Sequence, residues 1–119
     1  TGSIEGVHGL FILPDVWILP VGLTFTPRVA QSPNTWSRNH YTVGEWKRME
    51  AAGAVFLPAA GYRSRAKKIC DVNSVGAYWS VSNNGKEEAY YTYFDPGNVG
   101  AYETELRSYG YAVRLVKNK

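Results

Sequence analysis

Short apolar runs alternate with turn-forming residues along the chain, a pattern that predicts several short strands and few helices. The strands predicted from these runs cover residues 9–14, 54–58, 76–81, 88–95 and 110–116, with a further extended piece at 15–20. Asn83, Asn84 and Gly85 separate two of the runs. They predict a tight hairpin, because Asn and Gly tolerate the positive φ angles of such turns.

One helix is predicted, beginning after Thr42. Thr42 and Glu45 have the spacing of a capping box, and Tyr41 and Trp46 occupy the two positions of a hydrophobic staple. Apolar residues recur at helical spacing after that point, and Gly53 is a typical helix stop. Residues 26–40 have the composition of a loop. One helix followed by turn-linked strands predicts an α+β fold with an antiparallel sheet.

Alternation within residues 88–95 divides that strand into two faces. Phe94 is expected to point into the core together with Tyr90, whereas Tyr91 and Tyr93 are expected to face solvent. A long irregular loop is predicted at 97–109, where binding residues commonly lie. The ligand surface predicted from these positions comprises Trp79, Tyr91, Tyr93, Asp95, Tyr102, Glu103, Arg107 and Tyr109. The alternative is an ordinary tyrosine-rich sheet face beside an ordinary loop.

Composition indicates one folded domain of 119 residues with a net charge of +3, too small to predict nucleic-acid binding. Nine tyrosines favour a contact surface as well as a core. A basic cluster is interpreted as a solvated loop, with a phosphate or acidic-glycan contact as the weaker alternative; it comprises Arg63, Arg65, Lys67 and Lys68. Prolines interrupt the apolar stretch at 10–25, so no membrane insertion is predicted.

Residues suited to catalysis or metal binding are few. Cys70 is the only cysteine, which excludes an intrachain disulfide and a cysteine-rich zinc site. His8 and His40 have no triad context, and the carboxylates match no calcium-loop spacing. No catalytic residue, metal or cofactor is therefore predicted. An enzyme would require Cys70, His40 and a carboxylate in one pocket.

An ordered series of motifs carries a family resemblance. The motifs are GAVFLPAAGYR at 53–63, GAYWS at 76–80, AYYTYF at 89–94 and RSYGYAVRLV at 107–116, preceded by LPDVWILP at 13–20. Together they resemble the Fibrobacter succinogenes major paralogous domain family, abundant in exported proteins of gut Bacteroidetes. The resemblance implies a C-type lectin-like domain over 9–119, with a twisted antiparallel sheet, flanking helices and long loops. Residues 1–8 are then a trimmed segment or linker.

Two features of related domains are not carried over by this resemblance. The copper site of formylglycine-generating enzymes needs two cysteines, and only Cys70 is present. The Glu-Pro-Asn and Trp-Asn-Asp signatures of calcium-dependent lectins are also missing.

Residues 78–114 also resemble the variable region of proteins diversified by retroelements. Tyr91, Tyr93, Asp95, Tyr102, Glu103 and Tyr109 fall on variable positions in that alignment. Glu103 and Thr92 depart from the usual pattern of such regions. The resemblance implies a hypervariable ligand face.

Three functional hypotheses follow. The first is an exported ligand-binding or adhesin domain of such a bacterium or its phage, at the cell surface with its signal or lipoprotein anchor upstream, binding a protein or a glycan. The second is an enzyme of the formylglycine-generating or hydrolase type. The third is a structural module that contacts other domains of a longer surface protein or pilus.

Overall fold

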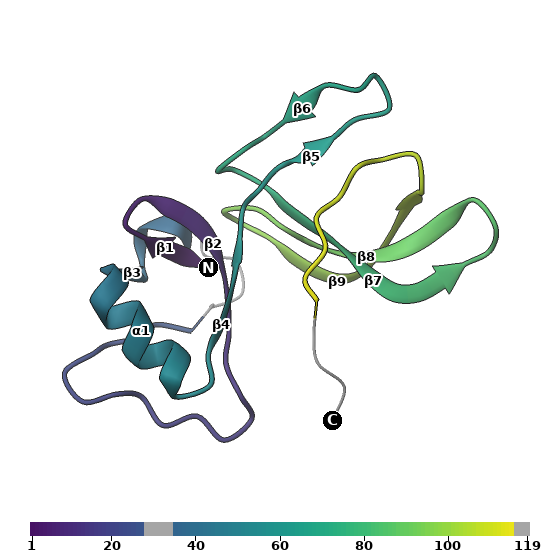
Figure 1. Cartoon of the computed structure of the whole chain (residues 1–119). Helices are drawn as coiled ribbons and strands as arrows, with labels where there is room; N and C mark the ends of the chain where they lie inside the picture. The colour runs from purple at the N-terminus through teal and green to yellow at the C-terminus, as the bar shows by residue number, and fades with distance from the viewer. Residues whose placement is uncertain (28–34, 116–119) are drawn as a thin grey trace.

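The first sheet is built from the N-terminal residues and a strand that follows the helix. The computed structural model describes residues 1–27 and 35–115. The sheet has the strand order β3-β1-β2-β4 (Figure 1). Its strands are β1 (Gly2–Ile4), β2 (Val7–Ile12), β3 (His40–Tyr41) and β4 (Val55–Pro58). β1 pairs antiparallel with β2 and parallel with β3, and β2 pairs antiparallel with β4.

Residues 1–8, expected to be a linker, are instead part of this sheet. Every residue from Thr1 to Ile4 is buried, and Glu5 and Gly6 form the tight turn into β2 with φ angles of 45° and 84°. The extended piece expected at 15–20 forms no strand, although Trp17 packs against the core beneath the sheet. β1 has only three residues, too few to show a hydrophobic period. Its pairing with β2 and β3 is what identifies it as a strand.

The predicted helix is confirmed as α1 (Val43–Ala51). The Glu45 N–H donates to Thr42 Oγ1 at 3.2 Å, and the Thr42 N–H donates to Glu45 Oε2 at 2.8 Å, which completes the capping box. Gly53 ends the helix with a φ of 101°. Met49 is fully buried and joins a core of five buried residues: Ile4, Phe11, Tyr41, Met49 and Ala54.

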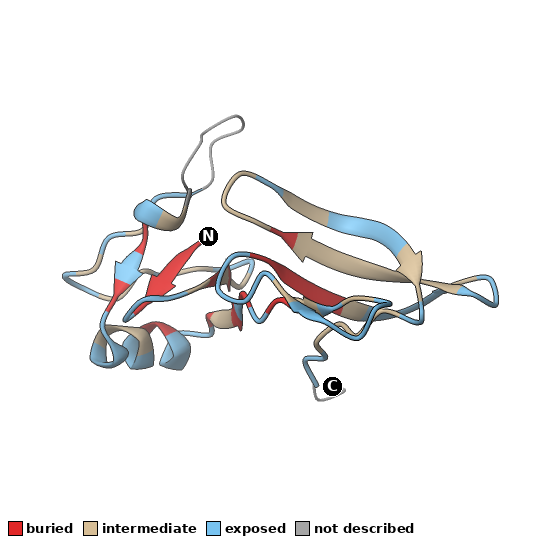
Figure 2. Ribbon diagram, turned by 90° about the horizontal axis from the view of Figure 1, so that it is seen from above, coloured by how far each residue is buried: buried red, intermediate tan, exposed pale blue. Residues whose placement is uncertain are grey.

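The second sheet has the order β7-β8-β9, with β7 (Gly76–Asn84), β8 (Glu88–Phe94) and β9 (Val99–Leu106) all antiparallel. The predicted hairpin between β7 and β8 is confirmed, and Gly85 in its turn has a φ of 72°. Phe94 is 0% exposed and stacks on Tyr78, and both pack on Leu57 and Ala59. This second core joins the two sheets, as the buried segments of Figure 2 show.

Two predictions about the C-terminal third are wrong. Residues 97–109, expected to be a long loop, contain β9. Residues 110–116, expected to be a strand, run irregularly as far as the description extends, at 115, with isolated bridges from Gly110 to Arg63 and from Ala112 to Tyr78. We call residues 107–115 the C-terminal segment; it crosses β7 in front of the second sheet (Figure 1). The stretch at 110–116 is the more apolar of the two, so local composition favours the wrong one, and long-range pairing decides between them.

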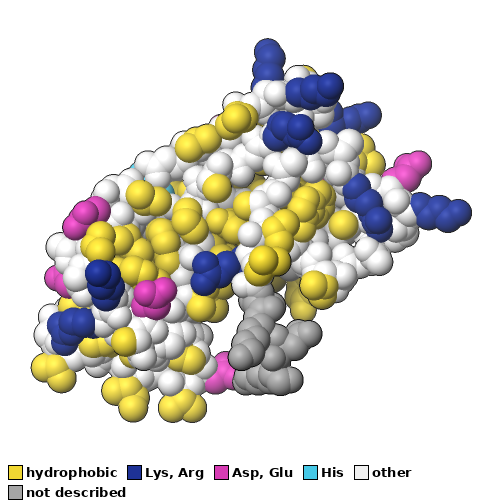
Figure 3. Space-filling view, in the orientation of Figure 1, with side chains coloured by type: hydrophobic (Ala, Val, Ile, Leu, Met, Phe, Trp, Pro, Cys, Tyr) yellow, Lys and Arg dark blue, Asp and Glu magenta, His cyan; other side chains and the backbone are white. Residues whose placement is uncertain are grey.

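A small two-stranded sheet, β5 (Tyr62–Arg63) and β6 (Ile69–Cys70), projects from the body between the two larger sheets (Figure 1). The basic cluster lies here, with Arg63 in β5 and the other three residues, Arg65, Lys67 and Lys68, between the two strands. Figure 3 shows dark-blue side chains gathered over this projection.

The predicted α+β fold, a C-type lectin-like sheet with flanking helices, is wrong. The described residues form three sheets, with α1 as the one α-helix and a single 3-10 turn, η1 (Thr35–Ser37). The physical reason lies in the sequence pattern: only residues 42–52 combine a helix cap with helical periodicity, so flanking helices have no amphipathic segment to form from. Among these described elements no helix is long and apolar enough to cross a membrane.

Candidate functional site

Strand register places two tyrosines on the side of the second sheet away from Phe94. Tyr91 lies directly opposite Trp79, and Tyr93 directly opposite Ala77, so these four share one face. We call this side of the sheet the tyrosine face. Tyr91 and Tyr93 are half-buried rather than fully exposed, because other side chains lie over them. Phe94 therefore lies in the core as expected, whereas Tyr91 and Tyr93, which were expected to face solvent, are partly covered.

The cover is aromatic, and its centre is Tyr111. The Tyr111 ring lies 4.5 Å from that of Trp79 and 4.6 Å from that of Tyr91, measured between centroids. Tyr109 and Tyr62 lie farther out, at 5.8 and 6.0 Å from Tyr111. All four distances fall in the range of favourable aromatic pairs. The Tyr111 ring thus adds side-chain contacts to the backbone hydrogen bonds that join the C-terminal segment to β5 and β7.

The hydroxyl groups of Tyr91, Tyr93 and Tyr111 stay protonated at physiological pH, because the pKa of each is raised. Burial raises the pKa of Tyr91 and of Tyr111, whose hydroxyls hydrogen-bond to each other. Burial, together with the hydrogen bond that Tyr93 donates to Asp95 at 2.9 Å, raises the pKa of Tyr93 to about 12. Each phenol is therefore a neutral group that can both donate and accept a hydrogen bond.

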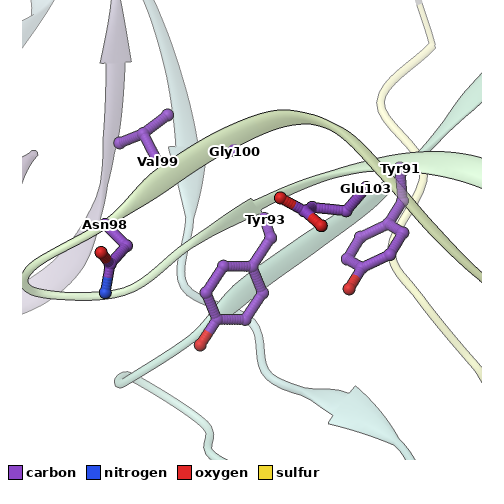
Figure 4. A pocket seen from close by; sticks show the side chains of 6 residues that line it. All are labelled: Tyr91, Tyr93, Asn98, Val99, Gly100 and Glu103. Carbon is purple, nitrogen blue, oxygen red and sulfur yellow. The ribbon is translucent and has the colours of Figure 1, made fainter.

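Beside these rings, a pocket of about 420 Å³ opens between β8 and β9. Its lining consists of Tyr91, Tyr93, Asn98, Val99, Gly100 and Glu103. In Figure 4 the rings of Tyr91 and Tyr93 project from the same side of β8, and the carboxylate of Glu103 extends between them. A volume of this size is ordinary for a small-ligand site. The pocket offers two aromatic rings, an amide and a carboxylate to whatever enters it.

Gly100 provides the space for the Glu103 carboxylate. A β-carbon at position 100 would lie 2.6 Å from Glu103 Oε1, closer than real contacts allow. The strand is irregular here, since the β8–β9 register shifts between Tyr91 and Tyr93. Such a bulge re-aims side chains near functional sites. The missing side chain at 100 therefore leaves room for the carboxylate at this position.

A second hollow, of about 220 Å³, lies under the aromatic cover. Tyr91 and Tyr93 also line this hollow, so the two share a wall. The remaining lining is Tyr62, Asp71, Val75, Ala77, Glu105, Tyr109 and Tyr111. The pair of hollows makes the tyrosine face a concave aromatic surface.

Asp95, predicted as a ligand-orienting carboxylate, holds the β8–β9 turn instead. Its Oδ1 accepts the N–H groups of Gly97 and Asn98 at 2.8 Å each, and its Oδ2 accepts the Tyr93 hydroxyl. Partial burial acts to raise the pKa of Asp95, but these hydrogen bonds outweigh it and hold the pKa below the ordinary value. Asp95 positions Tyr93 and Asn98 at the pocket.

Arg107, predicted to fix the orientation of a ligand, is bound to the chain itself. Its guanidinium donates to the carbonyl oxygens of Glu88 and Gly85 and to the side-chain oxygen of Asn83, at 3.0 to 3.1 Å. These bonds fasten the end of β9 to the β7–β8 hairpin. Tyr102 is 85% exposed and lines neither hollow. The predicted surface therefore divides into pocket residues, aromatic cover and structural supports, with Tyr102 outside all three groups.

Residues 33–116 match a protein family described as a domain of unknown function (DUF8237). The chain belongs to this family. The match spans β3 to the C-terminal segment, so every residue of the tyrosine face lies within the DUF8237 region. No curated protein matches the chain, and no solved structure matches it. The resemblance to the Fibrobacter succinogenes paralogous family and to retroelement-diversified proteins remains a prediction.

Sequence reasoning missed several contributors to this DUF8237 site. Tyr111, Tyr62 and Asn98 were not among the predicted ligand residues. Tyr109 and Tyr111 alternate in an extended stretch, a signal that both could face one side. Nothing in the sequence indicates that Tyr62, from another sheet, meets them.

The residues weighed for catalysis lie apart in the structure. Cys70 lies in β6, with its thiol 3.6 Å from the Lys68 carbonyl oxygen. His40 lies in β3 and bonds with Ser3, while His8 contacts the Asn73 carbonyl oxygen at 2.8 Å. Within the described ranges, no three His, Cys, Asp or Glu side chains are grouped to hold a metal ion.

Proposed function

We propose that the chain is a ligand-binding domain that recognises a protein or glycan partner through its tyrosine face. The observation that carries the proposal is the 420 Å³ pocket between β8 and β9, walled by Tyr91, Tyr93 and Glu103. It lies beside an aromatic cover, on a sheet whose other side is fastened by Phe94 to the first sheet. A concave aromatic surface with a few polar groups is the usual form of a binding site.

The chemistry of the face supports recognition. Tyrosine supplies a large contact area with only two side-chain rotations to restrain, and its hydroxyl can pair with either a donor or an acceptor. Tyr93 is already held by its bond to Asp95, and Tyr91 by its contacts with Tyr111. Little conformational entropy is therefore lost when a ligand enters, which favours affinity.

The same proposal includes an exported, adhesin-type setting at the bacterial surface. This part rests on the motif resemblance. Diversification of the face is proposed for Tyr91, Tyr93 and Glu103, which line the pocket. Asp95 and Tyr109 are less suited to variation, because the turn and the aromatic cover depend on their contacts.

The test is binding of the labelled chain to glycan and protein arrays, followed by titration of the ligand found. Tyr93→Ala and Asn98→Ala each remove one wall of the pocket. If Tyr93→Ala impairs folding, Asn98→Ala still tests the pocket, because Asn98 is the more exposed of the two. Loss of a true anchor costs about 2 kcal/mol or more, so affinity should fall roughly 30-fold. Tyr102→Ala, on the neighbouring strand but outside the pocket, is the matched control and should bind as the unaltered chain does.

Binding that survives both pocket substitutions would contradict the proposal. So would the absence of any ligand on either array. The tyrosine face would then be better explained as a contact with another domain of a longer protein, and it should be buried in that protein.

A further inference from the structure

We propose that the pocket between β8 and β9 selects a cationic group, the side chain of a lysine or arginine on a protein ligand. The inference rests on the proposed binding function and names the chemical class of its ligand. It is carried by the carboxylate of Glu103, the two rings that flank it, and the absence of a positive charge among the residues lining the pocket.

Glu103 is the carboxylate on the tyrosine face without a partner of its own. Within residues 1–27 and 35–115, no hydrogen bond or ion pair engages its exposed side chain, whose carboxylate lies next to Gly100 and extends between two tyrosines. The nearby acids differ. Asp95 accepts from Tyr93, Gly97 and Asn98, and Glu105 accepts from the Leu106 N–H at 2.9 Å.

None of the described lysines and arginines lines the pocket. Arg107, which follows β9, is bound to the β7–β8 hairpin by three hydrogen bonds. The basic cluster lies on the β5–β6 projection, as the dark-blue side chains over those strands show in Figure 3. Neither supplies a charge among the pocket residues. A positive group from a ligand would therefore meet an uncompensated carboxylate, although the whole chain carries a charge of +3.

The rings of Tyr91 and Tyr93 favour the same occupant. A cation beside a tyrosine ring is attracted by the negative face of the ring, and a carboxylate nearby adds a charge-assisted hydrogen bond. A neutral sugar could stack on the rings and donate hydroxyl hydrogen bonds to Glu103, but it would leave the negative charge uncompensated. An anionic group would be repelled by it. Charge complementarity thus favours a lysine or arginine side chain over both alternatives.

The test uses the isotopically labelled full chain and NMR titration with three probes. The probes are a capped Gly-Ser-Arg-Ser-Gly peptide, the same peptide with neutral citrulline in place of arginine, and the neutral sugar cellotriose. We expect the arginine peptide to shift the backbone amides of Asn98, Gly100 and Glu103. Glu103→Gln should weaken this binding on the order of tenfold. The comparison of arginine with citrulline needs no variant, so it does not depend on the folding of a mutant.

Two further variants sharpen the result. Gly100→Ala should also weaken binding of the arginine peptide, because a β-carbon there displaces the Glu103 carboxylate. Glu87→Gln removes the same charge from the exposed hairpin turn and should change affinity by less than about twofold. Each variant's amide spectrum without peptide reports whether it is folded.

Equal binding of the arginine and citrulline peptides would overturn the inference, as would equal binding by the Glu103→Gln variant. The absence of shifts with the arginine peptide would overturn it too. Shifts with cellotriose alone would overturn it in favour of a sugar ligand while leaving the proposed binding function intact. The proposed binding function is contradicted by a different result, namely that the ligand found on the arrays binds the Tyr93→Ala and Asn98→Ala variants as tightly as the unaltered chain.

Discussion

Tyr111 is the side chain on which the covered form of the tyrosine face depends, so its replacement by alanine is the most informative perturbation. Its ring has four aromatic neighbours: Trp79 at 4.5 Å, Tyr91 at 4.6 Å, Tyr109 at 5.8 Å and Tyr62 at 6.0 Å. These residues come from β7, β8, the C-terminal segment and β5. The substitution therefore releases contacts among four separate parts of the chain.

The expected loss can be worked from these contacts. Truncating a large ring in a core costs about 3–5 kcal/mol, and the half-buried Tyr111 should lie at the lower end, near 3 kcal/mol. For a chain of this length that corresponds to a fall in melting temperature of roughly 10 °C. Tyr111→Phe keeps the ring and loses only the hydroxyl bond to Tyr91, so it should cost about 1 kcal/mol.

Urea unfolding, followed by circular dichroism and by tryptophan fluorescence, measures these differences. Tyr102→Ala is the control, because that ring is 85% exposed and its removal should change the free energy of unfolding by less than about 0.5 kcal/mol. The reasoning is refuted if Tyr111→Ala is as stable as Tyr102→Ala. It is also refuted if Tyr111→Phe costs as much as Tyr111→Ala, since ring packing would then contribute nothing.

Three further predictions concern the supports of the site. Gly76→Ala should destabilise the fold by about 1–3 kcal/mol or more in urea unfolding, because its β-carbon would lie 2.0 Å from the buried Phe94 ring. Absorbance titration should give Tyr93 a pKa of about 12, and Asp95→Asn should lower this pKa. The folded state holds the Tyr93 proton more tightly than the unfolded state does. The protonated hydroxyl therefore contributes its full stabilisation below pH 10, and this stabilisation is lost as pH rises through 12. Arg107→Gln should lower the melting temperature by several degrees while leaving ligand affinity unchanged, and a selective loss of affinity would contradict its role as a clamp.

Local chemistry determined the elements whose signals lie within a few residues of one another. The capping box of Thr42 and Glu45 predicted where α1 begins, and both of its hydrogen bonds are formed. The turn at Gly85 predicted the β7–β8 hairpin, and the alternation in β8 assigned Phe94 to the core. Each signal acts through hydrogen bonds or side-chain directions within a short segment, so it does not depend on contacts with distant parts of the chain.

Partnerships between distant segments could not be predicted from such signals. Residues 99–106 read as a loop because Gly100 and the acids at 103 and 105 lower strand propensity, yet pairing with β8 makes them β9. Residues 110–115 read as a strand, but they lie across the second sheet with isolated bridges. In both stretches the strand propensity of the residues is a weak predictor, and the structure depends on whether a neighbouring strand is in position to pair with them.

The candidate site shows the same division. The sequence by itself determined that Tyr91 and Tyr93 share a face opposite Phe94, because successive side chains in a strand alternate. Only the tertiary structure decided that Tyr111 and Tyr62 cover that face, that Asp95 and Arg107 are bound to the chain, and that Glu103 is not. Those outcomes depend on which groups come within a few ångströms after folding, and hydrogen bonds and ring contacts act only at that range.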